Sequence, residues 1–339
     1  MKHDKIIIGH GSGGRLTNNL IKDMFVKYFD NEILDMQGDS SVLTVEGNTL
    51  SFTTDSFVVN PVFFPGGNIG NLAIAGTVND LAVSGAKPLY LSAGFIIEEG
   101  LPLEDLETIV KTMAGEAKAA GVKIVTGDTK VVERGKADKI FINTTGIGVL
   151  PPSRKHIGSG KNIVAGDKIL INGAVGDHGM AVMAKRNELN ISSDIKSDCA
   201  ALNGLIAGVF EAAGEGVKFM RDATRGGLSA VLTEMFEGKD FGVEIEEDAV
   251  PVHEAVAGMC ELLGFDPFHV ANEGKVVIVV DEKSADAVLR AMHRHPLGKE
   301  AAIIGEVTAE HKGKGHIITA VGGRRIIDMP AGELLPRIC

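Results

Sequence analysis

The chain has 339 residues, which is more than one hydrophobic core usually serves and therefore predicts two domains. Its 34 Lys and Arg against 45 Asp and Glu give a net charge of −11, and this acidic balance argues against nucleic acid as a partner. The three cysteines cannot form a disulfide framework, and they favour a reducing compartment such as the cytoplasm.

No segment has the composition of an export signal or a membrane span. Near the N-terminus only residues 6–8 form an apolar run, which is too short for a secretory signal. The longest apolar-rich stretch, 71–97, is interrupted by Asn79-Asp80 and Lys87-Pro88. We therefore expect a cytoplasmic protein that does not bind the membrane.

The first half of the chain predicts a mixture of strands and helices. The β-rich stretches around Gly47-Asn48 predict a hairpin, and the small and apolar residues of 68–84 predict a helix that packs on most sides. The expected strands are 41–46, 49–54, 89–97, 122–125 and 140–149, and the expected helices are 16–29, 68–84 and 103–120.

The second half follows Pro151-Pro152 and a Gly-, Lys- and Ser-rich stretch, 153–166, that predicts a linker. The expected strands are 168–172, 217–220, 242–245, 276–280, 303–307, 317–321 and 324–328, and the expected helices are 179–186, 200–213, 227–236, 252–263 and 284–293. This pattern predicts an α/β (α+β) fold of two α/β domains. The expected divisions are 1–40, 41–152, 153–328 and 329–339.

A glycine-rich motif, Gly9-His10-Gly11-Ser12-Gly13-Gly14, precedes the first expected helix. It fits the G-x-G-x-x-G pattern of dinucleotide-binding folds, with Asp35 about 20 residues further on. It equally fits a flexible lid whose backbone N–H groups bind phosphate. In this motif His10 is either a phosphate contact or a polar residue of the turn.

Acidic residues recur where expected strands or helices end or are interrupted. They are Asp39, Asp55, Asp80 (beside Asn79), Asp128 and Asp222. Charges in such apolar surroundings are costly unless they are paired or bind a metal. Carboxylates that converge from separate strands suit Mg²⁺ bound to nucleotide phosphates, and the chain has no P-loop.

Three further segments carry candidate functional groups. Asp222 or Thr224 is expected to cap the helix that begins at Gly227, where Gly226-Gly227 would let an anion approach, although a plain turn would use the same residues. Lys130 directly follows an expected turn at 127–129, and Glu273 directly precedes the strand 276–280. Each is a candidate acid, base or electrostatic clamp, or else a solvated loop residue.

The cysteines differ in their surroundings. Cys199 and Cys260 lie among aliphatic residues and are expected to be inert, and their spacing does not suit zinc. Cys339 is the last residue. It is either a carrier of a reactive group on a mobile tail or an accident of a frayed end.

Six segments together resemble one known family. They are Gly9-His10-Gly11-Ser12-Gly13-Gly14, residues 63–70 (Phe-Phe-Pro-Gly-Gly-Asn-Ile-Gly), residues 126–132 (Thr-Gly-Asp-Thr-Lys-Val-Val), residues 222–227 (Asp-Ala-Thr-Arg-Gly-Gly), residues 271–275 (Ala-Asn-Glu-Gly-Lys) and the ending Pro-Arg-Ile-Cys. Over its whole length the chain resembles the HypE family of hydrogenase-maturation proteins, and the ending is the most specific element. The aspartates alone would indicate the broader superfamily of aminoimidazole ribonucleotide synthetase, selenophosphate synthetase and thiamine-monophosphate kinase.

The resemblance implies an ATP-dependent carbamoyl dehydratase that makes the cyanide ligands of nickel–iron hydrogenase. The carbamoyltransferase HypF would load a carbamoyl group on Cys339, ATP would phosphorylate its oxygen, and loss of phosphate would leave a thiocyanate. The nitrile would pass to iron on the HypC–HypD complex. The resemblance further implies a homodimer in which the sheets of residues 41–152 pair into a barrel that holds ATP near the interface, and a mobile tail, 329–339.

The resemblance also implies a role for each candidate residue. Cys339 would carry the substrate, Glu273 would take an amide proton, and Lys130 would stabilise charge on the oxygen. The residues expected to bind Mg²⁺ are Asp39, Asp55, Asp80, Asp128 and Asp222. Those expected to bind the nucleotide are His10, Thr54, Asp55, Asn79, Asp80, Gly127, Asp128, Asp222 and Thr224.

Three rival functions remain open at this point. An NAD-dependent oxidoreductase would use Gly9 to Gly14 but leaves the aspartates unexplained. A passive carrier would use only Cys339. A selenophosphate synthetase would want a reactive cysteine in the N-terminal glycine-rich segment, where the chain has none. A dehydratase additionally needs an inward and an outward state of the tail, and we expect nucleotide to favour the inward state.

Overall fold

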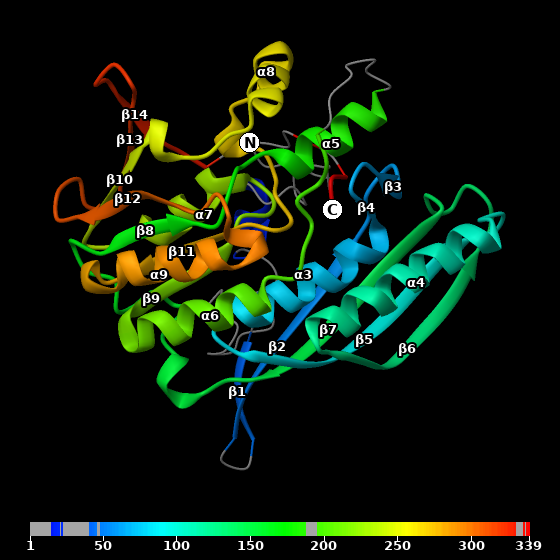
Figure 1. The fold of residues 1–339 in the computed structure, drawn as a ribbon. Coiled ribbons are helices and arrows are strands. Elements are labelled where there is room, and N and C mark those ends of the chain that lie inside the picture. Colours follow the sequence, from blue (N-terminus) through cyan, green and yellow to red (C-terminus); the bar gives the residue numbers. More distant parts are fainter. Residues whose placement is uncertain are drawn as a thin grey trace.

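Two sheets, each covered by helices, make up most of the fold (Figure 1). The computed structural model describes residues 15–20, 22, 41–45, 48–187, 195–329, 335 and 337–339. Among these residues no helix is long and apolar enough to cross a membrane. The α/β class expected from the sequence is confirmed.

The first sheet has five strands in the order β1-β2-β7-β5-β6. Its strands are β1 (Ser41–Val45), β2 (Asn48–Phe57), β5 (Lys87–Glu98), β6 (Lys123–Val132) and β7 (Ile140–Val149). All neighbours are antiparallel except β5 and β6, which are parallel. The helices α3 (Ile69–Val83) and α4 (Leu103–Ala120) cover one face of this sheet, and β3 (Phe63–Phe64) and β4 (Gly67–Asn68) form a small hairpin before α3 (Figure 1).

Helix α3 is buried on almost all sides, as its small and apolar residues predict. Asn68 caps its start by accepting a hydrogen bond from the N–H of Gly70, at 2.8 Å. Leu72 belongs to the hydrophobic core of the first sheet, whereas Ala82 and Val83 pack into a core of the second sheet. This one helix therefore joins the two halves of the molecule.

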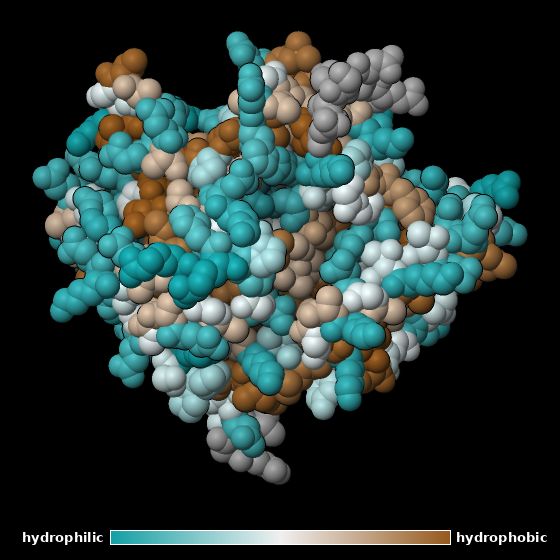
Figure 2. Space-filling view, viewed as in Figure 1, coloured by the Kyte–Doolittle hydropathy of each residue, from teal (hydrophilic) through white to brown (hydrophobic). Residues whose placement is uncertain are grey.

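The second sheet has seven strands in the order β14-β13-β10-β12-β8-β11-β9. They are β8 (Lys168–Ile171), β9 (Val217–Asp222), β10 (Gly242–Glu246), β11 (Val276–Val280), β12 (Ala302–Thr308), β13 (Gly315–Ile318) and β14 (Arg324–Ile327). Every residue of β11 is buried, because α7 (Gly227–Phe236) covers one face while α6 (Asn203–Ala213) and α9 (Glu282–Arg294) cover the other. The outward face of α9 is hydrophilic (Figure 2).

The remaining described helices lie at the edges of these layers. They are α1 (Arg15–Leu20), α5 (Asp177–Arg186), α8 (Glu254–Leu263) and short 3-10 helices at Pro152–Arg154, Gly214–Gly216, Glu247–Ala249, Pro267–His269 and Pro296–Gly298. The stretch expected to be a linker, 153–166, contains Ile157 and Ile163, which are both buried. It is therefore a packed connection rather than a free one.

Strand β6 corrects one expectation about the first half. Residues 127–129 were expected to form a turn, but they continue the strand, which runs to Val132. Gly127 is needed for space, since a Cβ there would lie 2.2 Å from the carbonyl oxygen of Ala93 on β5. The pairing of β5 with β6 has a register shift between Leu91 and Ser92, close to this contact.

Candidate active site

The last residues of the chain, 337–339, form a terminal segment that lies beside residues 58–60. The N–H of Val58 donates to the main-chain oxygen of Cys339 at 3.1 Å, and the N–H of Asn60 donates to the carbonyl oxygen of Arg337 at 3.2 Å. Ile338 is 2% exposed and belongs to the core of the first sheet. The frayed-end alternative for Cys339 is therefore wrong for this structure.

The thiol of Cys339 is influenced by two acidic residues, Glu273 and Asp55, and by one cation, Arg225. Burial raises its pKa strongly, and the charges of Glu273 and Asp55 act in the same direction, as does a hydrogen bond from the thiol to Glu273. Arg225 opposes the shift, and its own pKa is raised by Cys339, Asp55 and Glu273. The docked cysteine is therefore a neutral thiol rather than a nucleophilic thiolate.

Glu273 is the most perturbed carboxyl group beside this thiol. It is 3% exposed, and its Oε1 atom has no hydrogen-bond partner. Burial raises its pKa well above the ordinary value, and the charges of Asp222, Asp198 and Asp55 add to the shift. A buried carboxyl group with one unpaired oxygen and a raised pKa has the properties of a general base.

Three of the expected aspartates converge on the same place from different elements. Asp55 comes from β2 and lies against α3, where a Cβ on Gly76 would be 3.4 Å from its Oδ2. Asp80 comes from α3 and accepts a hydrogen bond from Thr53 Oγ1 at 2.7 Å. Asp222 ends β9 and is 7% exposed. Their charges act on the pKa of Glu273 or of Arg225, so all three lie within electrostatic range of a residue that acts on the thiol.

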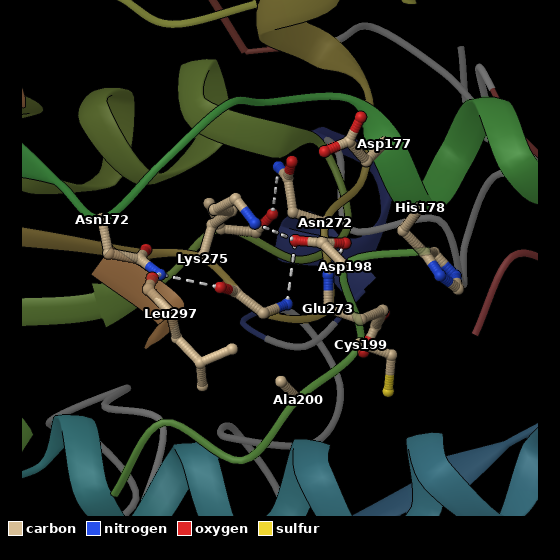
Figure 3. Close-up of polar contacts among 12 residues, drawn as sticks. Asn172, Asp177, His178, Asp198, Cys199, Ala200, Asn272, Glu273, Lys275 and Leu297 are labelled. Atoms are coloured by element: carbon tan, nitrogen blue, oxygen red, sulfur yellow. Dashed lines mark hydrogen bonds and ion pairs between the residues drawn. The ribbon is translucent and has the colours of Figure 1, made fainter. Parts of the chain in front are cut away.

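The turn that carries Glu273 is held by a buried carboxylate (Figure 3). Asp198 accepts hydrogen bonds from the N–H groups of Glu273 and Gly274, both at 3.1 Å, and from Lys275 Nζ at 2.9 Å. Burial acts to raise the pKa of Asp198, but the charge of Lys275 together with the hydrogen bonds from Lys275 and the Glu273 N–H and the nearby His178 outweighs burial, and the pKa lies below its ordinary value. A Cβ at Gly274 would lie 2.0 Å from the Asp198 carbonyl oxygen, so only glycine fits there.

Two asparagines fix the same turn from the other side (Figure 3). Asn272 accepts from the N–H of Gly176 and donates to the carbonyl of Ala223, each at 2.8 Å. Asn172 donates to the carbonyl of Gly274 at 3.0 Å. Glu273 therefore projects from a rigid backbone, which is what a positioned base requires.

Removing the charge of Asp198 should destabilise the fold and lower the pKa of Glu273. Asp198 and Lys275 are 4% and 10% exposed, so Asp198→Asn leaves a buried cation unpaired and should cost about 3–5 kcal/mol of unfolding free energy in urea. The double variant with Lys275→Met should cost less than Asp198→Asn alone. Because Asp198 raises the pKa of Glu273, the variant should also lower that pKa. Equal losses in the single and double variants would contradict this role.

Other expected site residues lie on the opposite face of the first sheet. Strand pairing places Asp128 and Lys130 opposite Gly94 and Ile96, away from the α3 side. Both are exposed, and their side chains form an ion pair at 3.1 Å that contributes to lowering the pKa of Asp128. Thr54 lies on the same outer face and donates to the carbonyl of Thr144. One chain alone does not bring these residues to Glu273.

Asn79 and Thr224 lie close to the site but in different settings from those expected. The amide of Asn79 donates to the carbonyl of Ala200 at 3.1 Å and accepts from the N–H of Leu202 at 2.7 Å, so it joins α3 to the segment before α6. Gly226, not Asp222 or Thr224, is the N-cap of α7, and no side chain caps this helix. That capping prediction is wrong.

Two expected ligands, His10 and Asp39, lie outside the described residues, as does the glycine-rich motif. Within the described part of the chain, no three His, Cys, Asp or Glu side chains are grouped so that they could hold a metal ion by themselves. Asp55, Asp80 and Asp222 nevertheless offer the carboxylate oxygens that Mg²⁺ prefers when phosphates supply its other ligands.

Sequence reasoning missed several residues of this site. Arg225 and Lys275 stand inside quoted motifs, Asp-Ala-Thr-Arg-Gly-Gly and Ala-Asn-Glu-Gly-Lys, and charged residues beside glycines were the available signal. Asp198 precedes Cys199, which lies in an irregular segment because α6 begins only at Asn203. No local pattern marks Asp198, since its partners are about 75 residues away.

Comparison with known proteins identifies the family of the chain. Residues 37–150 match the family model for the N-terminal domain of AIR synthase related proteins, and residues 164–318 match the model for the C-terminal domain. The carbamoyl dehydratase HypE of Rhizobium leguminosarum is 52% identical over 335 residues, which cover 99% of this chain and 95% of the relative. This chain belongs to the HypE family.

Other HypE proteins are similarly close. HypE of Escherichia coli is 50% identical over 99% of this chain and 100% of the relative. A solved HypE–HypF complex superimposes with a TM-score of 0.86 at 51% identity, covering 92% of this chain and 99% of that chain. A HypE structure in complex with ATP has a TM-score of 0.82 at 44% identity and covers 99% of this chain and 100% of that one.

Proposed function

We propose that this protein is an ATP-dependent carbamoyl dehydratase of hydrogenase maturation that converts an S-carbamoyl group on Cys339 into an S-thiocyanate. The observation that carries this proposal is the docked terminal segment, which places the Cys339 thiol beside Glu273 with Arg225 nearby. A NAD-dependent oxidoreductase would leave this arrangement without a use. The family membership supports the same reaction.

The reaction balances with ATP as the only co-substrate. The carbamoyl oxygen attacks the γ-phosphorus of ATP and ADP leaves. The amide nitrogen then loses both of its protons, one of them to Glu273 and the other to solvent, and the C–O bond breaks to release phosphate as C≡N forms. Overall, R–S–CO–NH₂ and ATP give R–S–CN, ADP, phosphate and one proton. Arg225, whose charge interacts with Cys339, would stabilise negative charge on the oxygen while it reacts.

The loading step belongs outside this site. Burial and the neighbouring carboxyl groups keep the docked Cys339 thiol protonated, and a thiol is a poor acceptor of a carbamoyl group. The terminal segment must therefore leave the site to be loaded by a HypF carbamoyltransferase, and leave it again to pass the nitrile to HypC–HypD. A cytoplasmic location keeps the cysteine reduced between these steps.

Mg²⁺ and the nucleotide would be held by the aspartates whose charges act on Glu273 or Arg225. Asp55, Asp80 and Asp222 supply hard oxygen ligands, and Asp39 is a further candidate. When bound, Mg²⁺ would neutralise the phosphates and lower the repulsion that the carboxyl groups exert on Glu273. This would bring Glu273 towards the ionised form that a base needs.

A homodimer would complete the site. Phe52, Ile147 and Tyr90 are neighbours on β2, β7 and β5, and they are 40%, 37% and 47% exposed on the outer face of the first sheet. A second copy packed there would bury this apolar row and pair the two sheets into a barrel. Because Lys130 lies on this outer face, its role on the oxygen depends on that dimer.

The dimer is tested at the centre of the apolar row. Ile147→Glu would place a charge from each copy in the interface, so the dissociation constant of the dimer should rise by about a hundredfold or more in analytical ultracentrifugation. Ile326→Glu, at an exposed position on β14 of the other sheet, is the matched control and should leave the dimer intact. A dimer that is insensitive to Ile147→Glu would exclude this interface.

The dehydratase itself is tested by intact mass. The chain is loaded with a HypF carbamoyltransferase, separated from it, and then given Mg-ATP. A dehydratase loses the mass of one water from the loaded form, whereas a passive carrier keeps its carbamoyl mass. Retention of the carbamoyl mass under these conditions would refute the proposed function.

A further inference from the structure

Helix α5 holds the terminal segment by its main chain. His178, in the first turn, has Nε2 at 2.8 Å from the carbonyl oxygen of Ile338. Arg186, the last residue of the helix, donates from Nη2 to the carbonyl oxygen of Arg337 at 2.6 Å and from Nε to that of Asn60 at 2.7 Å. Two side chains of one helix therefore bind consecutive carbonyl groups of the terminal segment.

The hydrogen-bond partners of His178 assign its tautomer. A carbonyl oxygen only accepts, so Nε2 carries the hydrogen and Nδ1 accepts from the hydroxyl of Ser197 at 2.8 Å. Ser197 in turn accepts from the N–H of Cys199 at 3.1 Å. Burial lowers the pKa of His178, which keeps the ring neutral as this chain of bonds requires.

The surroundings also fix the position of the ring. His178 is fully buried, and its ring lies perpendicular to that of Phe64 with the ring centres 5.4 Å apart. Rotating the ring would leave Nε2–H and the Ile338 carbonyl unpaired in the core, and an unpaired buried polar group is costly. In the docked state Ser197 and Phe64 therefore hold the ring in the orientation that presents Nε2–H to the Ile338 carbonyl.

We propose that His178 and Arg186 are positioning residues that set the fraction of molecules in which Cys339 is docked beside Glu273. They bind main-chain carbonyls and not the thiol, so they hold the terminal segment in the same way whether the sulfur is free or carries a carbamoyl group. Docking favours dehydration and opposes loading, because loading needs Cys339 exposed. This second consequence rests on the proposed function, whereas docking itself does not.

Docking is measured by alkylation of the unloaded chain with iodoacetamide, followed by peptide mass analysis of each cysteine. His178→Ala and Arg186→Met should each raise the alkylation rate of Cys339 by about tenfold, while the buried Cys260 stays unchanged. His178→Gln keeps an N–H donor and should restore part of the protection. Lys185→Met, at the exposed neighbouring position on α5, should have no effect.

Two results would overturn the proposal. One is an unchanged Cys339 rate in both variants, and the other is a rise at Cys339 that occurs only together with a rise at Cys260. In single-turnover assays the same variants should dehydrate about tenfold more slowly once loaded, while their loading rate should not fall. An equal fall in the loading and dehydration rates would also refute the proposal. Alkylation does not depend on enzymatic activity. A chain that never dehydrates would therefore refute the proposed function, whereas the alkylation rates of Cys339 would still decide whether His178 and Arg186 control docking.

Discussion

Glu273→Gln should load a carbamoyl group normally and then fail to dehydrate it. The substitution keeps the size and the buried position of the side chain but removes the group that takes the amide proton, and loss of a general base costs about 10²–10⁴ in rate. Intact mass before and after Mg-ATP reports both steps. Glu310→Gln, at an exposed position on a loop, is the matched control and should react like the unaltered chain.

The pH dependence should follow the raised pKa of Glu273. A base acts only when ionised, so the dehydration rate should increase as pH rises through this pKa, and the increase should be missing from any residual activity of Glu273→Gln.

The free energy of unfolding should change with pH in the opposite direction to the dehydration rate. A carboxyl pKa that is raised by folding makes the folded chain lose stability as pH rises from its unfolded pKa to its folded pKa. Above neutral pH the Glu273→Gln variant should therefore be more stable than the unaltered chain. If Glu273→Gln dehydrates its carbamoyl group at the normal rate, Glu273 is excluded as the base.

Cys339→Ala should abolish loading altogether. The sulfur is the atom that carries the substrate, and no other group can replace it in the terminal segment. After incubation with the carbamoyltransferase, the intact mass of this variant should be unchanged.

Cys260→Ala is the matched control for that experiment, because Cys260 is buried in α8 and away from the site. It should gain one carbamoyl group per chain. A carbamoyl group on the Cys339→Ala variant would mean that the substrate is carried elsewhere.

Local sequence patterns predict most elements of the fold. The strand at 140–149 and the helices at 103–120 and 227–236 have the expected bounds, because their hydrophobic spacing and their Gly and Pro neighbours are decisive. The turn expected at 127–129 was mispredicted, since Gly-Asp-Thr is a usual turn signal. There the glycine serves the close approach of β5 to β6, which no local pattern reveals.

The site was predictable in its chemistry but not in its grouping. Asp55, Asp80, Asp222 and Glu273 are polar residues in apolar surroundings, and they do converge. Whether Asp128 joins them depends on which face of β6 it occupies, and that is set by pairing with β5. The docked position of Cys339 depends on a main-chain hydrogen bond from Val58, about 280 residues away, and on a bond from the Arg337 side chain to the Val58 carbonyl, and no sequence pattern specifies these bonds.

The double membership of α3 has a thermodynamic consequence. Leu72 stabilises the core of the first sheet and Val83 that of the second, so neither core can melt without exposing apolar surface of the same helix. The two halves of the chain are therefore expected to unfold as one cooperative unit. Asp80 lies on this shared helix, so the binding free energy of a ligand held there would stabilise both halves of the molecule against unfolding.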